Sequence, residues 1–199
     1  MDDSAELRTG RLRLRRWRGA DRSAFAVSNA DPEVMEYFPA PLTRAESDLL
    51  VDRIEAEFDE RGYGLWAVDV VATGEFIGFA GLSVPGFEAH FTPAVEVGWR
   101  QARTAWGHGY ATEAARAAVD FGFNQVGLPV IVSFTAATNQ RSRAVMERIG
   151  MTRDPAGDFD HPHLPQYHRL LRHVLYRIFH GQAVVGDETG PVPLPGEPS

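Results

Sequence analysis

Alternating apolar and polar residues mark the segments of this chain that are predicted to be strands. The first is RLRLRRW, where Leu12 and Leu14 recur with a period of two and the arginines take the other face, as in an amphipathic edge strand. Ala72, Thr73 and Gly74 suit a hairpin turn between two later strands. Runs of the same kind predict strands at 65–71, 75–84, 94–100, 129–135, from residue 151, and at 172–179.

Apolar residues at helical spacing predict four helices between these strands. The first covers 20–29 and ends before Asp31. The second starts with a capping box made by Thr43 and Glu46 and stops at Gly62. Its buried face is expected to carry Leu49, Leu50, Ile54 and Phe58.

The other two helices flank the strand at 129–135. The third carries Ala115, Val119 and Phe123 at a spacing suited to burial, and the fourth covers 139–149. The resulting order, β-α-α-β-β-β-α-β-α-β-β, excludes a pure βαβ array. It predicts an α/β (mixed α+β) fold, in which helices cover the faces of a mixed sheet.

Length and composition describe one soluble globular domain, with no stretch apolar enough to cross a membrane. The 199 residues are 44% hydrophobic and 24% charged, and we expect residues 1–180 to be one domain followed by a Gly/Pro-rich tail at 181–199. No signal peptide is evident, so the cytoplasm is the default compartment. The net charge of −7 argues against general nucleic-acid binding, and the absence of cysteine excludes disulfides and thiolate chemistry.

The most informative motif is WGHGYATEAARAAVDFGF, a glycine-rich loop that opens directly into an amphipathic helix. A helix N-terminus offers unpaired N–H groups and a favourable dipole to a pyrophosphate, and Gly107 and Gly109 let the main chain approach it closely. The alternatives are a plain strand-to-helix turn or a dinucleotide fingerprint. The fingerprint is disfavoured because GHGYAT lacks its third glycine and the preceding strands form a meander.

A second block, TAATNQRSRAVMERIGM, joins a strand end to a helix that Gly150 closes. Together the two blocks resemble the GNAT superfamily of acyl-CoA N-acyltransferases, and more narrowly its RimJ/RimL-like branch. The resemblance covers about residues 7–179. It implies a GNAT-like, mostly antiparallel sheet of six to seven strands with about four helices, and acetyl-CoA as co-substrate. Trp106 departs from the Gln/Arg that opens the general GNAT phosphate loop, Gln/Arg-x-x-Gly-x-Gly/Ala.

The resemblance also assigns the residues that bind the cofactor. Main-chain groups of Val97, Gly98 and Trp99, on a splayed strand, would lie beside the acetyl and pantetheine portions. The phosphate loop would comprise Trp106, Gly107, His108, Gly109, Tyr110, Ala111 and Thr112. Arg103, Arg141 and Arg143 are candidates for the phosphates of coenzyme A, or are solvated surface arginines.

Glu96 takes the position of a glutamate that acts in many GNATs as a general base through water; otherwise it is an exposed carboxylate paired with Arg100 or another neighbour. Asn139 resembles an asparagine that hydrogen-bonds pantetheine, and a helix N-cap would equally explain it. Met146 replaces the tyrosine that protonates the leaving thiolate in many GNATs. Ser142 is therefore the candidate to meet the sulfur, as in RimL-like enzymes, or is a surface serine.

The segment at 158–168 is rich in Asp and His, so a metal site is conceivable from composition, but the branch needs none. We expect this loop, with Tyr37, Phe38 and the 87–91 segment, to border the acceptor pocket or to be core. The predicted function is transfer of acetyl from acetyl-CoA to a primary amine, on a protein N-terminus or a small molecule, by a ternary-complex mechanism. A silent acyl-CoA-binding or regulatory protein, an aminoglycoside-type acetyltransferase and a tail-mediated interaction protein are the alternatives, and base rate favours a homodimer.

Overall fold

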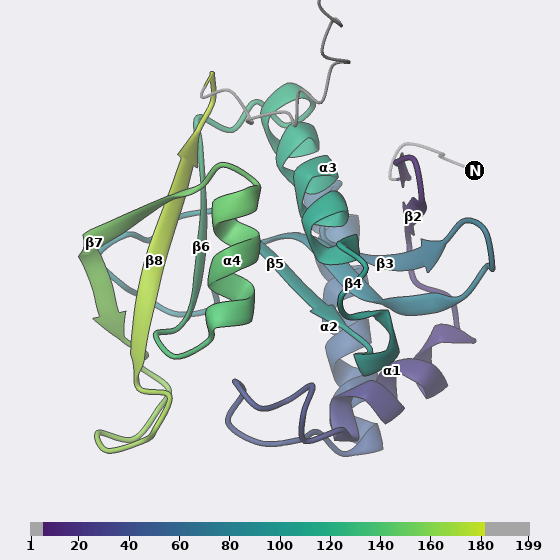
Figure 1. Cartoon of the computed structure of the whole chain (residues 1–199), viewed down its shortest axis with the longest axis horizontal. Coiled ribbons are helices and arrows are strands. Elements are labelled where there is room, and N and C mark those ends of the chain that lie inside the picture. Colours follow the sequence, from purple (N-terminus) through teal and green to yellow (C-terminus); the bar gives the residue numbers. More distant parts are fainter. Residues whose placement is uncertain (1–5, 182–199) are drawn as a thin grey trace, which may run out of the picture.

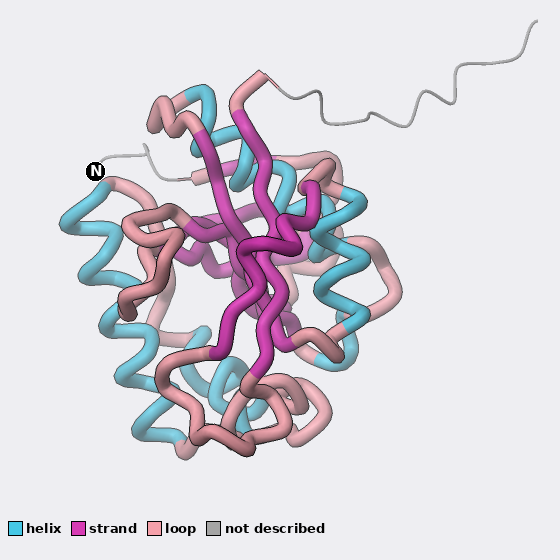
Figure 2. Tube along the Cα trace, turned by 90° about the vertical axis from the view of Figure 1, so that its left-hand side faces the viewer, coloured by secondary structure: helices cyan, strands magenta, loops and turns pink. Residues whose placement is uncertain are grey.

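The structure is a computed structural model that describes residues 6–181, so the predicted tail lies almost entirely outside the described residues. One sheet runs through the molecule, with helices on both of its sides (Figures 1 and 2). Its strands are β1 (Leu7–Arg8), β2 (Leu12–Arg15), β3 (Leu65–Val70), β4 (Phe76–Ser83), β5 (Glu96–Gln101), β6 (Val130–Ala136), β7 (Thr152–Asp160) and β8 (Arg172–Phe179). The helices are α1 (Asp21–Ala30), α2 (Arg44–Arg61), α3 (Tyr110–Asn124) and α4 (Gln140–Arg148), with a 3₁₀ turn at Arg103–Ala105.

The predicted mixed α/β fold is confirmed, with one strand more than expected. The strands of the described chain lie in the order β1-β2-β3-β4-β5-β6-β8-β7, and every neighbouring pair is antiparallel except β5 and β6. The extra strand is β1, which pairs Leu7 with Leu14 of β2. The prediction that RLRLRRW forms an edge strand is therefore wrong, because β1 covers that edge.

Residues on both faces of β2 are buried, for different reasons. Leu12 and Leu14 lie in the core, as the alternation predicts. On the other face Arg15 is only 6% exposed, and its guanidinium donates hydrogen bonds to the carboxylates of Asp21 in α1 and Asp69 in β3. A buried arginine needs such partners, because an isolated charge costs several kcal/mol to bury.

The bounds of α2 follow from its capping residues. Thr43 and Glu46 form the predicted capping box at the start of α2, and Gly62 closes this helix with φ of 76°. The face that α2 buries carries Val51, Ile54 and Phe58, whereas Leu49 is 62% exposed. The assignment of Leu49 to the buried face was wrong because that face runs through 47, 51, 54 and 58.

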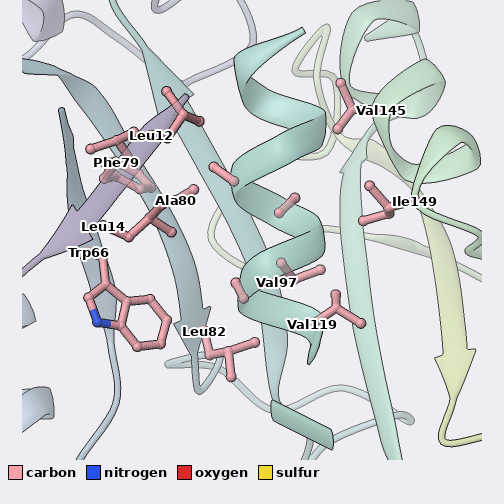
Figure 3. Packing of buried hydrophobic residues seen from close by; sticks show 14 of the residues in the cluster. Leu12, Leu14, Trp66, Phe79, Ala80, Leu82, Val97, Val119, Val145 and Ile149 are labelled. Carbon is pink, nitrogen blue, oxygen red and sulfur yellow. The ribbon is translucent and has the colours of Figure 1, made fainter. Parts of the chain in front are cut away.

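The main core includes residues of all four helices, which pack on the two faces of the sheet. In Figure 3, Val145 and Ile149 from the α4 region lie on the side of α3 to which Val119 points, and Leu12 and Phe79 of the sheet lie on its other side. In Figure 1, α3 and α4 lie in front of the sheet and α2 behind it. Phe25 of α1 packs edge-on against Phe79 of β4, with ring centroids 5.9 Å apart. No helix in residues 6–181 is long and apolar enough to cross a membrane.

The strands β5 and β6 meet at one point and then separate. Their ladder holds one pair, Glu96 with Val132, and the Val132 N–H donates to the Val95 carbonyl over 2.9 Å. Beyond it the two strands diverge, visibly in Figure 1, and the Ser133 hydroxyl bridges to the Val97 carbonyl. The sheet is thus open at its middle, between α3 and α4.

Candidate active site

A continuous cavity of about 2020 Å³ lies around this opening. It gathers most of the residues singled out from the sequence: Glu96, Gly98, Trp99, Trp106, Gly107, Gly109, Tyr110, Ala111, Thr112, Asn139, Arg141 and Ser142. Val97, Arg103, His108 and Arg143 do not line it. Val97 is fully buried, with its carbonyl already bonded to Ser133, and the His108 ring stacks on that of Tyr110.

The glycine-rich loop has a backbone that only glycine adopts easily. Gly107 and Gly109 have φ of 80° and 77°, and Gly109 is the N-cap of α3 without any side-chain cap. The Glu113 N–H is the first in α3 to find a main-chain acceptor, the Gly109 carbonyl, so the preceding amides stay free. A Cβ on Gly107 would meet nothing within 4 Å, so the space above the loop is open. The loop therefore fits a pyrophosphate.

Arg11 supplies a cation at this loop that the sequence analysis missed. Its Nη1 donates to the His108 carbonyl over 2.9 Å, and its Nε donates to Glu113 over 2.7 Å. Its Nη2 would lie 3.6 Å from a Cβ on Gly109. Arg11 precedes the loop by nearly a hundred positions in the sequence, so no local signal connects the two.

The three arginines proposed for the phosphates take different positions. The Arg141 guanidinium lies 4.3 Å above the Trp106 ring and pairs with Glu36. Arg103 lies over the same ring, at 5.3 Å, and pairs with Glu33, outside the cavity lining. Arg143 turns toward β8, where it donates to the Tyr176 hydroxyl, and it also donates to the Ala137 carbonyl just after β6.

Glu96 lies where β5 and β6 part. Its side chain borders the cavity but is otherwise surrounded by protein, and this desolvation raises its pKa to about 8. It forms no ion pair among the described residues, so the predicted pairing with Arg100 is wrong. A carboxylate that titrates near neutral pH suits a general base.

Asn139 and Ser142 are joined at the start of α4. The Asn139 amide also donates to Thr135, so its orientation is fixed from two sides. Met146 is 1% exposed and borders the cavity at the position of the family tyrosine. The Met146 side chain cannot donate a proton, so Ser142 is the residue of α4 at the cavity with a hydroxyl that could donate one.

Aromatic and histidine rings form the wall of the cavity next to β7 and β8. The predicted loop at 158–168 begins within β7, so its first three residues are strand. Phe87 contacts the ring of His161, with centroids 4.8 Å apart, and His173 follows at 5.0 Å from His161. Burial lowers the pKa of His161 to about 4, so that ring is neutral. No group of three or more His, Cys, Asp or Glu in residues 6–181 is arranged to hold a metal ion.

Comparisons with known proteins agree with this geometry. The family model described as "Acetyltransferase (GNAT) domain" matches residues 11–152. The chain is 34% identical over 154 residues to the uncharacterized protein YkkB of Bacillus subtilis, covering 76% of this chain and 87% of that protein. It is also 34% identical over 153 residues to the FsC-acetyl coenzyme A-N(2)-transacetylase of Aspergillus fumigatus, covering 73% of this chain and 64% of that protein.

Solved structures share the fold. An acetyltransferase from Agrobacterium tumefaciens is 31% identical, with a TM-score of 0.71 over 89% of this chain and 96% of its own. RimL, a ribosomal L7/L12 alpha-N-protein acetyltransferase solved with coenzyme A, is 17% identical, with a TM-score of 0.68 over 86% of this chain and 95% of its own. At that identity the likeness to RimL shows the shared fold alone.

Proposed function

The chain belongs to the acetyltransferase (GNAT) family and uses acetyl-CoA, and from this premise we propose that it transfers acetyl directly to a primary amine in a ternary complex. The observation that carries the proposal is the position of Glu96, which borders the same cavity as the glycine-rich loop. Acetyl-CoA supplies an activated thioester. The amides of the first turn of α3 would hold its pyrophosphate, and Gly98 and Trp99 on the open edge of β5 would border its pantetheine arm.

Glu96 would accept the proton that the amine loses. With a pKa raised to about 8, its carboxylate is a stronger base than an ordinary glutamate, which titrates near 4.5. An alkyl amine with a pKa near 10.4 is about one thousandth neutral at pH 7.5, a deficit of about 4 kcal/mol. This deficit is fixed by the pH and the amine, but a base with a pKa nearer that of the amine makes the proton transfer itself less unfavourable, and cavity water can relay the proton.

Ser142 would donate to the sulfur as the carbon–sulfur bond breaks. Because the Asn139 Nδ2 donates to the Ser142 Oγ over 3.1 Å, the hydroxyl proton of Ser142 is free to point into the cavity. A thiol has a pKa near 8.5, so one hydrogen bond is adequate help for this leaving group, and the loss of the family tyrosine at Met146 is tolerable.

The acceptor amine would enter beside β5, from the side of Phe38 and Phe87. The named activity of the Aspergillus relative involves an N(2) position, and RimL acts on a ribosomal protein. We propose a primary amine of either kind, a small molecule or a protein N-terminus, for this chain.

The test is thiol release from acetyl-CoA with a panel of primary amines and N-terminal peptides, comparing the wild type with Glu96→Gln. We expect turnover with at least one amine and a loss of about 10²-fold in kcat in the variant. Glu75→Gln, at an exposed turn outside the cavity, is the matched control and should retain full activity. Equal turnover by the wild type and Glu96→Gln would refute the role of Glu96.

A further inference from the structure

Arg100 is a cation in the cavity that the proposed chemistry does not use. It lies four residues after Glu96 on β5, so both side chains, with Gly98 between them, project from the same face of the strand. All three positions border the cavity. This face is the one on which α1 packs, opposite the face that Val97 buries against α3.

Among residues 6–181, Arg100 has no counter-charge. Its Nη1 donates to the Asn29 side-chain oxygen over 2.7 Å, and its guanidinium lies 4.0 Å above the Phe38 ring. Its Nε is buried without any hydrogen-bond partner, and no carboxylate within residues 6–181 pairs with it. The nearby loop carboxylates of Glu33 and Glu36 pair instead with Arg103 and Arg141.

Buried polar groups fix the position of Arg100. Asn29 is fully buried, and its amide donates to the hydroxyl of Ser47, which is also fully buried. Burial lowers the pKa of Arg100 to about 10, which still leaves it charged at neutral pH. Arg100 is half-buried, and a charge held partly out of water without a counter-ion destabilises a fold, whereas the buried Arg15 is paired with two carboxylates. An arginine kept without a carboxylate is suited to an anion that arrives with a ligand.

We propose that the acceptor is a small amine that also carries a carboxylate, with Arg100 binding the carboxylate and Glu96 facing the amine. This inference rests on the proposed function, because Glu96 locates the amine. Gly98 provides the space between the two groups. A Cβ there would meet a single atom within 4 Å, the Glu96 Oε1 at 3.8 Å, so the floor between the two charged side chains is open.

The strand sets the length of such an acceptor. Four residues span roughly 13 Å between the Cα atoms of Glu96 and Arg100, and both side chains can lean over Gly98. The amine and the carboxylate should therefore be separated by several bonds. An ω-amino acid or a peptide-like amino acid derivative fits this spacing better than glycine does.

The experiment pairs each acid with its uncharged amide. A series of ω-amino acids, from glycine to 8-aminooctanoate, and the corresponding carboxamides are assayed with the wild type, Arg100→Met and Arg100→Gln. Arg18→Met removes an exposed arginine outside the cavity and is the control. Melting curves and calorimetric titration with acetyl-CoA establish that each variant is folded and binds the cofactor.

We expect the wild type to prefer the acid over its amide by about 10- to 100-fold in kcat/KM, with an optimum at intermediate length. The preference should disappear in both Arg100 variants because the KM for the acid rises. The kinetic constants for the amides and the KM for acetyl-CoA should not change. An equal kcat/KM for acids and amides in the wild type, with turnover present, would overturn the inference and leave the proposed function intact. If no amine is acetylated, calorimetric titration of the acids into the wild type with coenzyme A decides. Binding by the wild type that is lost in Arg100→Met supports the carboxylate site. No binding by the wild type, or equal binding by both proteins, overturns it.

Discussion

Asn139 and Ser142 hold each other by two hydrogen bonds at the start of α4. The Asn139 Oδ1 accepts the Ser142 N–H over 3.1 Å, and the Asn139 Nδ2 donates to the Ser142 Oγ over 3.1 Å. The first bond is a helix cap, and in the second the Ser142 Oγ, which borders the cavity, is the acceptor. Both alternatives that the sequence offered for Asn139, a cap and a site residue, are compatible with this geometry.

Ser142→Ala should lower kcat by about tenfold and change the KM for acetyl-CoA little, because the hydroxyl acts when the thiolate leaves. Ser142→Thr keeps the hydroxyl and should restore most of the rate. The loss should also shrink with a thioester whose thiol has a lower pKa. An unchanged kcat in Ser142→Ala would remove this residue from the mechanism.

The pH dependence of kcat/KM should reflect the ionisation of the Glu96 carboxylate. Its carboxylate must be ionised to accept a proton, so log kcat/KM of the wild type should rise with pH and bend near 8, the value to which burial raises this pKa. Glu96→Gln should lack this bend and keep only the titration of the amine. The measurement is a kcat/KM profile from pH 5.5 to 10, and a wild-type bend near 4.5 would contradict it.

The same group should affect stability. Its folded pKa is raised above the unfolded value, so its contribution is complete below about pH 4.5 and is lost as pH rises through about 8. The glutamine of Glu96→Gln does not titrate, so the melting temperature of this variant minus that of the wild type should increase between pH 5 and pH 9. Because Glu96 borders the cavity and is partly hydrated, we expect the difference in unfolding free energy to change by about 1 kcal/mol, which is roughly 2–4 °C in melting temperature. A gain that shrinks with rising pH would refute the burial argument.

Gly109→Ala should weaken the binding of acetyl-CoA, because its φ of 77° is strained for any residue with a Cβ and the loop must shift to relieve the strain. Gly62→Ala is a closely matched control: φ is 76°, a Cβ would meet nothing within 4 Å, and the site is the end of α2. Both variants should lose roughly 1–2 kcal/mol of stability. Calorimetry should show weakened acetyl-CoA binding in Gly109→Ala alone.

Arg11→Gln should raise the KM for acetyl-CoA by about tenfold and leave kcat nearly unchanged. The expected effect is moderate because Glu113 already neutralises part of the Arg11 charge. The effect should diminish at high salt, since this pair is partly exposed. Arg61→Gln, at the far end of α2, should leave both constants unchanged, and an equal KM for Arg11→Gln and the wild type would exclude Arg11 from phosphate binding.

The features that the sequence predicted well are those encoded locally. The loop around Gly107 and Gly109, the cap at Asn139 and the box at Thr43 each depend on residues a few positions apart. Alternation along β5 also places Glu96 and Arg100 on one face of the strand, although the sequence alone did not show that Arg100 has no carboxylate partner among the described residues.

The features that were missed depend on contacts between distant segments. Arg11 reaches the loop because β1 and β2 lie beside the start of α3, which no local pattern announces. Arg143 lies two residues after Arg141, and on a helix that spacing turns the two side chains to different sides, one to Trp106 and the other to Tyr176.

Two-substrate kinetics test the central claim, direct transfer of acetyl to an amine, most directly. Initial rates are measured at varied acetyl-CoA and varied concentrations of the best amine from the panel, and the intact mass of the protein is recorded with acetyl-CoA alone. The account predicts intersecting reciprocal lines and a protein of unchanged mass. Parallel lines, together with a protein heavier by one acetyl group, would contradict it.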